Sequence, residues 1–199
     1  MNRTLFVIDV QESFRQREIW RAGSNPDLIP NVNHLVENFR ASGDLVIWVL
    51  HSEPGTGGVF DPANGHVRLL DGIIAPRPTE PTLIKTSHNV FTTTNAGQIL
   101  TERRIFDVTV CGIRTEQCVE TTARVGGDLG YAVTFVTDAT LTFPIPHPDA
   151  AAHSVDEILA DPRTLGVEAI VERTERVLDG RFAAIRSTAD VTGAALVAS

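Results

Sequence analysis

Lysine is nearly absent from this sequence of 199 residues, in which Lys85 is the single lysine among 17 basic side chains. Acidic side chains number 25, so the formal net charge is −8. A chain with this charge has nothing that would draw it to phosphate backbones or to anionic lipids. The composition therefore argues against nucleic-acid and membrane partners.

Cysteines and long apolar runs are also scarce. The two cysteines, Cys111 and Cys118, cannot build the disulfide framework of a small secreted protein. No apolar run approaches the ~18 residues of a membrane-spanning helix. Asp9 interrupts the first apolar run before it is long enough for a signal sequence. These absences predict a cytoplasmic protein in which each cysteine is either a core residue or a reactive thiol.

The sequence is rich in short apolar runs of Val, Ile and Phe, which alternate with segments of helical periodicity. This alternation is typical of buried parallel strands in βαβ units. It predicts a single α/β domain over residues 1–199, with an open parallel sheet and helices on both faces. The predicted strands are residues 4–8, 45–50, 82–84, 106–111, 132–136 and 168–171.

Helices are predicted between these strands. One begins at Pro30 and ends before Gly43, a second spans 94–103, and a third spans 115–129 with Thr115 as its N-cap. The segments 52–81 and 142–148 are rich in glycine or proline and are predicted to be loops beside a site. Residues 189–199 show little apolar pattern, and we interpret them as a C-terminal arm that could contact another subunit.

Three chemically distinct residues stand near the ends of predicted strands. Asp9 follows the first strand, Lys85 ends the third, and Cys118 lies in the first turn of the helix after the fourth. Each alone has an ordinary explanation, as a turn cap, a solvated lysine or a small core thiol. Because ligands bind outside the carboxyl ends of parallel strands, we expect the three side chains to meet at one edge of the sheet.

The three residue types are complementary for acyl transfer. The N-terminus of a helix favours a thiolate, so Cys118 is the candidate nucleophile, whereas Cys111 lies inside an apolar strand. Asp9 can take the thiol proton and later activate water, and Lys85 can stabilise the thiolate. Backbone N–H groups at the start of the helix can receive the oxyanion of a tetrahedral intermediate.

Several segments of the sequence resemble the isochorismatase-like cysteine hydrolases. They are FVIDVQ at residues 6–11, IK at 84–85, CGIRTEQCVETTAR at 111–124, GY at 130–131 and VTDAT at 136–140. The resemblance covers residues 4 to 145 in matching order. It implies a six-stranded parallel sheet flanked by helices, with Asp9, Lys85 and Cys118 as the catalytic triad. It also implies a cis peptide bond between Ile113 and Arg114, which turns the Arg114 N–H toward the same oxyanion as the Cys118 N–H.

The resemblance further implies hydrolysis of a C–N bond in a small amide, imide or carbamoyl compound, through a thioester on Cys118 and without a cofactor. One alternative is the vinyl-ether hydrolysis of the isochorismatases proper, which do not use the cysteine. Another is a non-catalytic, flavodoxin-like domain for binding or assembly. That domain would need a glycine-rich turn after the first strand, where this chain has acidic residues. The expected partners are a small-molecule substrate and further copies of the chain, in a dimer or tetramer.

Some further residues are candidates for contacts with the oxyanion or the substrate: Gln11, Phe14, His51, Phe91, Arg114 and Cys118. Nicotinamidases of this family bind a metal through an Asp-Trp-His run, and this chain has His51, Ser52 and Glu53 there. We therefore expect no metal, although His51 and Glu53 carry donor atoms. The guanidinium of Arg114 could face an anionic substrate group, a subunit contact or a loop carbonyl.

Overall fold

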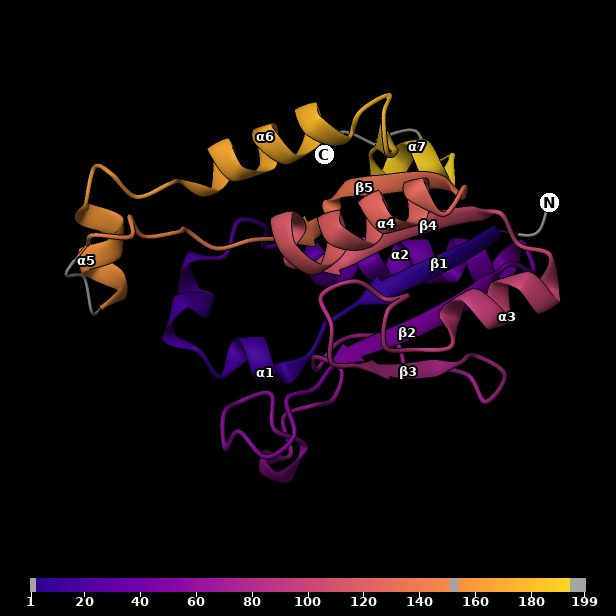
Figure 1. Ribbon diagram of the computed structural model, residues 1–199, viewed down its shortest axis with the longest axis horizontal. Helices are drawn as coiled ribbons and strands as arrows, with labels where there is room; N and C mark the ends of the chain where they lie inside the picture. Colours follow the sequence, from indigo (N-terminus) through magenta and orange to yellow (C-terminus); the bar gives the residue numbers. More distant parts are fainter. Residues whose placement is uncertain (1–2, 151–153, 194–199) are drawn as a thin grey trace.

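The computed structural model, which describes residues 3–150 and 154–193, is built around a six-stranded parallel sheet (Figure 1). The strands are β1 (Arg3–Ile8), β2 (Leu45–His51), β3 (Thr82–Lys85), β4 (Asp107–Ile113), β5 (Ala132–Leu141) and β6 (Ala184–Arg186). They lie in the order β3-β2-β1-β4-β5-β6, and every neighbouring pair is parallel. The predicted fold class, a single-domain parallel α/β sheet, is confirmed.

Helices cover both faces of this sheet. They are α1 (Glu12–Arg15), η1 (Glu18–Ala22), α2 (Leu28–Ala41), η2 (Pro62–Asn64), α3 (Ala96–Arg103), η3 (Thr115–Val119), α4 (Glu120–Asp128), α5 (Val155–Ala160), α6 (Val167–Leu178) and α7 (Thr188–Thr192). In the two described ranges, no helix has both the length and the apolar character that a bilayer crossing requires.

Side chains of β1 point alternately to the two faces of the sheet, and the core accordingly has two layers. Leu5 and Val7 belong to the buried cluster that contains α2, whereas Phe6 and Ile8 belong to the cluster that contains residues of α3 and α4. Successive side chains of a strand point to opposite faces, so a strand covered on both sides must be apolar throughout. This explains the uninterrupted apolar run that precedes Asp9.

The predicted sixth strand is wrong. Residues 168–171 lie inside α6, in which the buried residues Ile170, Thr174 and Leu178 recur at a spacing of four. Such spacing places them on one face of a helix, but the short run of apolar residues at its start also fits a strand. The actual strand, β6, has three residues, none of them fully buried. So short an edge strand gives almost no periodic signal.

Two helices differ from their predicted starts. α2 begins at Leu28, before Pro30, because proline is tolerated in the first turn of a helix, where N–H groups have no intrahelical partner. α3 begins at Ala96 and not at Thr94, whose hydroxyl oxygen accepts a hydrogen bond from the Ala96 N–H at 3.1 Å. Both differences lie within the usual uncertainty of helix ends.

The segment predicted as a C-terminal arm begins within helix α7. Helix α7 packs on α2 and β5 of its own chain, and Val191 lies against the core. Residues 194–199 of the predicted arm lie outside the described residues. Residues 188–193 are therefore part of the domain.

Strand β4 lies close to the backbone of β1 at Gly112, which pairs with Ile8. A Cβ atom at Gly112 would lie 1.9 Å from the carbonyl oxygen of Ile8, and the φ angle of Gly112 is +126°. Only glycine adopts this conformation without strain, and no side-chain movement could relieve a clash with backbone. Gly112 thus fixes the distance between the strand that precedes Asp9 and the strand that leads to Cys118.

We expect Gly112→Ala to lower the free energy of unfolding by at least ~3 kcal/mol, because the new Cβ meets backbone. Gly97 in α3 is the matched control, since a Cβ there meets nothing within 4 Å. Gly97→Ala should stabilise the protein by about 0.5 kcal/mol. Urea unfolding followed by circular dichroism measures both effects. Equal stabilities of the two variants would contradict the close approach of the strands.

Candidate active site

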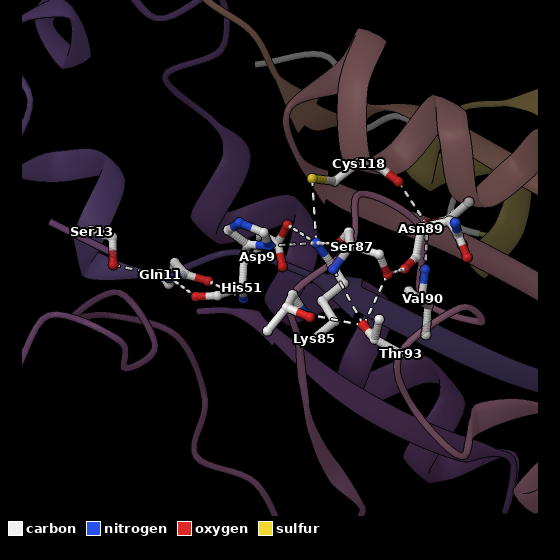
Figure 2. A network of polar contacts seen from close by, with 12 residues as sticks. Asp9, Gln11, Ser13, His51, Lys85, Ser87, Asn89, Val90, Thr93 and Cys118 are labelled. Atoms are coloured by element: carbon white, nitrogen blue, oxygen red, sulfur yellow. Dashed lines mark hydrogen bonds and ion pairs between the residues drawn. The ribbon is translucent and has the colours of Figure 1, made fainter. Parts of the chain in front are cut away.

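Asp9, Lys85 and Cys118 meet at the carboxyl edge of the sheet (Figure 2). The Nζ atom of Lys85 lies 2.8 Å from Oδ2 of Asp9 and 3.3 Å from Sγ of Cys118. The side chains of Asp9 and Lys85 have no exposed surface, and Cys118 is 7% exposed. The structure therefore brings together the three residues that the sequence singled out, in a place nearly closed to water.

The backbone after β1 directs Asp9 toward Lys85. Asp9 has a φ angle of +52°, in the left-handed region that few residues other than glycine adopt. Its N–H donates to the carbonyl oxygen of Val49 at 2.8 Å, and its own carbonyl oxygen accepts from the N–H of Gln11 at 2.9 Å. These bonds hold a residue whose conformation is unfavourable by itself, which is common where a side chain must be aimed.

Lys85 ends β3, where it pairs with His51 of β2. Besides Asp9 and Cys118, its Nζ atom contacts the carbonyl oxygen of Ser87 at 3.1 Å and Nδ1 of His51 at 3.4 Å. Figure 2 shows the ammonium at the centre of these four groups. A buried ammonium is stabilised only when its N–H groups have acceptors, and this site supplies them.

Cys118 lies in η3, a π-helical turn that precedes α4. The N–H of Val119 donates to the carbonyl oxygen of Arg114, five residues earlier, at 3.2 Å. The predicted helix over residues 115–129 is present, as η3 followed directly by α4, but its predicted N-cap, Thr115, is wrong. Arg114 is the N-cap, and the Thr115 hydroxyl instead donates to Oγ1 of Thr140 in β5 at 2.8 Å. π-Helical turns within helices are frequent at functional sites.

Two further hydrogen bonds, both made by Thr122, hold the other side of this turn. The Thr122 hydroxyl donates to the carbonyl oxygen of Cys118 at 2.6 Å and accepts from the N–H of Val90 at 3.2 Å. As predicted, the inner face of the helix consists of the buried residues Val119, Ala123 and Gly126. The turn that carries the thiol is therefore bonded both to β5 and to the loop that follows β3.

Burial raises the pKa of both acidic groups in the site. Loss of solvation is the largest cause for Cys118, and the charge of Asp9 adds to it while Lys85 opposes it, so the pKa of the thiol is raised to about 12. Burial likewise raises the pKa of Asp9 above its ordinary value, with Lys85 opposing. Burial therefore works against the thiolate that the sequence favoured at this helix start, whereas Lys85 works for it.

The other thiol, Cys111, lies in β4 with no exposed surface. Its Sγ contacts the carbonyl oxygen of Phe6 at 3.6 Å, and burial raises its pKa. Cys111 is therefore a core residue.

His51 lies at the end of β2, with its ring between Lys85 and Glu53. Its Nε2 atom is 3.2 Å from Oε1 of Glu53. Gln11 holds its backbone, because the His51 N–H donates to Gln11 Oε1 at 2.7 Å and the His51 carbonyl accepts from Gln11 Nε2 at 3.0 Å. Gln11 Nε2 also donates to the Ser13 hydroxyl at 2.9 Å. The amide of Gln11 thus holds the backbone of His51 and bonds to Ser13, and the expected contact of Gln11 with substrate stays a prediction.

Two predicted contact residues are engaged in packing. The ring of Phe91 stacks on Tyr131 with centroids 5.5 Å apart, next to the amino end of β5. Phe91 also packs edge-on against Phe6, with centroids 5.9 Å apart, and its contact with substrate stays a prediction. Phe14 is buried between the rings of Phe60 and Phe143, with centroids 5.0 and 6.1 Å away.

Arg114 makes the contact with a loop carbonyl that the sequence left open as one alternative. Its guanidinium donates to the carbonyl oxygen of Phe143 at 3.0 Å and lies over the Phe143 ring, 5.1 Å from the centroid. Its Nε atom is 3.2 Å from Oε1 of Glu116. The arginine is thus hydrogen-bonded to a loop carbonyl and ion-paired with a carboxylate within its own chain. The peptide bond between Ile113 and Arg114 is cis.

A cavity of about 390 Å³ lies beside the turn of Cys118. Arg114 and Gln117 form one wall, and the segments 17–19 and 143–146 and two residues of α5 form the others. Helix α5 stands away from the sheet, at the end of the chain segment that follows β5 (Figure 1). Apart from two arginines, a glutamate and a glutamine, the lining is apolar.

The residues near His51 do not fit a metal ion of the nicotinamidase kind. Within residues 3–150 and 154–193, no three His, Cys, Asp or Glu side chains are grouped as metal ligands would be. One nitrogen of His51 faces the ammonium of Lys85 at 3.4 Å, and the other faces Glu53. A metal ion on the first nitrogen would meet a positive charge at contact distance.

Comparison with known proteins gives a consistent family assignment. The family model described as Isochorismatase domain matches residues 3–166. The isochorismatase family protein YrdC of Bacillus subtilis (strain 168) is 30% identical over 141 residues, which are 71% of this chain and 74% of that protein. Streptothricin hydrolase of Streptomyces noursei is 31% identical over 145 residues, 72% of this chain and 56% of that protein.

A solved structure shares the fold over nearly the whole length. It is that of an isochorismatase family protein from Chromobacterium violaceum, with a TM-score of 0.84 and 22% identity, covering 96% of this chain and 92% of that one. The same sheet therefore underlies both proteins. Since the family model spans most of the sequence and the fold agrees with it, this chain belongs to the isochorismatase family of hydrolases.

Proposed function

We propose that the protein is a cysteine-dependent hydrolase that cleaves a C–N bond of a small amide, imide or carbamoyl compound. The observation that carries this proposal is the contact of one buried ammonium, on Lys85, with both Asp9 at 2.8 Å and Cys118 at 3.3 Å. A nucleophile, a base and a cation in one hydrogen-bonded group are what acyl transfer requires. A relative named for the hydrolysis of streptothricin also supports hydrolysis of a small molecule.

In the first step, the thiol of Cys118 gives its proton to the carboxylate of Asp9, and the sulfur forms a bond to the substrate's carbonyl carbon. Burial raises the pKa of both groups, so the proton moves between two sites that each disfavour the ionised form. Lys85 stabilises the sulfur while it is negative. The electron pair displaced from the carbonyl bond moves to oxygen, where the N–H groups of Arg114 and Cys118 receive it.

In the second step, the C–N bond breaks as Asp9 returns its proton to the leaving nitrogen, and a thioester remains on Cys118. Asp9 is then a carboxylate again and takes a proton from water, whose oxygen attacks the thioester carbon. The C–S bond breaks, the acid product leaves, and Asp9 returns the proton to sulfur. One water is consumed, and the thiol is restored.

The remainder of the substrate occupies the 390 Å³ cavity beside the Cys118 turn. Its mainly apolar lining suits a compact organic group, and the charge of Arg114 is already paired with Glu116 at 3.2 Å. An anionic substrate group is therefore not required. The volume of the cavity lies within the range of ordinary small-molecule sites, although Asp9, Lys85 and Cys118 themselves do not line it.

The two alternatives explain the site less well. Vinyl-ether hydrolysis would leave Cys118 without a task, although three elements are arranged around its turn. A phosphate-binding domain would need free N–H groups after β1, but Glu12 is buried there, and its carboxylate accepts hydrogen bonds from Asp71 and Arg15.

We expect Cys118→Ala to lower kcat by at least ~1,000-fold without loss of fold, because it removes the nucleophile. Cys111→Ala is the matched control, since it removes a buried thiol that contacts only core residues and should leave kcat near that of the wild type. A screen over amides, ureas and carbamoyl acids supplies the assay. Near-native turnover by folded Cys118→Ala would refute the proposed mechanism.

Lys85→Arg should lower kcat/KM by at least ~100-fold, or about 2.7 kcal/mol of transition-state stabilisation. The planar guanidinium is too wide to replace an ammonium that contacts four groups in a closed site. The opposite exchange at an exposed position, Arg176→Lys, should change neither fold nor rate, because Arg176 is 75% exposed. If both variants retain full activity, Lys85 is not part of the catalytic group.

Exhaustive chelation should leave activity unchanged, because the ammonium of Lys85 occupies the side of His51 that a metal would need. Activity is measured after dialysis against a strong chelator and again after addition of zinc or iron. Loss of activity that either metal restores would show that His51 and Glu53 are ligands after all.

A further inference from the structure

The ammonium of Lys85 has more acceptors than donors. A protonated lysine carries three N–H groups. Four groups lie within bonding distance of its Nζ: Asp9 Oδ2 at 2.8 Å, Ser87 O at 3.1 Å, Cys118 Sγ at 3.3 Å and His51 Nδ1 at 3.4 Å. The two short contacts are with oxygen atoms. His51 and Cys118 therefore share the third N–H group.

The surroundings of His51 determine which of its nitrogens is an acceptor. Its Nε2 atom faces the carboxylate of Glu53 at 3.2 Å, which accepts a hydrogen and so favours an Nε2–H. Nδ1 of a neutral ring then carries a lone pair, directed at Lys85. The other titratable groups around the ring are Asp9 and His88, whose ring centroid is 6.4 Å away. Phe60 and the amide of Gln11 fix the ring and its backbone.

We infer that His51 is a positioning residue that accepts the third N–H of Lys85 whenever the sulfur of Cys118 is uncharged, and releases it when the sulfur becomes a thiolate. A neutral thiol is a weak acceptor, so the N–H bonds to His51. A thiolate is a charged acceptor and takes the N–H instead. No proton is transferred in this exchange, because only the direction of one N–H group changes.

This inference rests on the proposed function, in which the sulfur alternates between charged and uncharged states. It is uncharged as thiol and as thioester, and negative just before attack and just after release of the acyl group. When the sulfur is uncharged, His51 accepts the third N–H of Lys85. Without His51, that N–H group would be buried without an acceptor, which costs free energy. His51 thereby stabilises the resting thiol relative to the thiolate.

The test compares His51→Leu with His51→Asn. The two replacements have nearly the same shape, but only asparagine keeps an acceptor at the position of Nδ1. Iodoacetamide alkylation of Cys118 in the folded protein, followed by peptide mass spectrometry at one mildly alkaline pH, measures the thiolate fraction. Alkylation of Cys111 in the same samples reports any unfolding.

We expect His51→Leu to be alkylated at Cys118 about 10-fold faster than the wild type. The variant loses the hydrogen bond from Lys85 to His51 that stabilises the site while Cys118 is a thiol. His51→Asn should stay within about 2-fold of the wild type. The direction is distinctive, because damage to the site alone would affect both variants alike. Equal rates in the two variants, or slower alkylation of His51→Leu, would overturn the inference.

A measurement on the unmodified protein avoids dependence on variants that fail to fold. Long-range nitrogen–proton correlation spectra distinguish the two neutral tautomers of histidine. The Nε2–H form is expected for His51, and the Nδ1–H form would refute the inference. Because neither experiment uses turnover, a proposed function refuted by an active Cys118→Ala is distinguishable from failure of the role of His51.

Discussion

A lysine ammonium with no exposed surface is the constraint on which the arrangement of this site depends. Removing a charge from water is costly unless partners surround it, and here they come from four separate parts of the chain. The strand order β3-β2-β1-β4 makes this possible, because it places the ends of β1, β2 and β3 next to one another and η3 directly beyond β4. Asp9, His51 and Cys118 can therefore all reach the single Nζ atom of Lys85.

Several unusual backbone features near this edge also help to bring partners to the ammonium of Lys85. Asp9 has a left-handed conformation, Gly112 lets β4 approach the backbone of β1, and a π-helical turn carries Cys118. Together they bring three strand ends within hydrogen-bonding distance of one atom, and the hydrogen bonds of Gln11 and Thr115 keep them there. Stability and chemistry thus use the same contacts.

The sequence predicted the centre of the site better than its surroundings. Asp9, Lys85 and Cys118 could be found because residue type and position at a strand end are both local properties. The contacts of Gln11 and Phe91 could not be predicted in this way. An amide or an aromatic ring can point toward the substrate or into the protein, and only tertiary packing determines its direction. The same limit explains the misplaced sixth strand, since a three-residue edge strand is defined by its neighbour β5 and not by its own residues.

The single, buried lysine also changes how this protein responds to amine chemistry. Reagents that acylate lysine find no ε-amino group on the folded surface, because Lys85 is the only lysine in the sequence and its side chain is fully enclosed. Modification of Lys85 requires that the carboxyl edge of the sheet first opens. The rate of its acylation therefore measures local opening of the active site, which in most proteins is hidden by the many lysines that react at the surface.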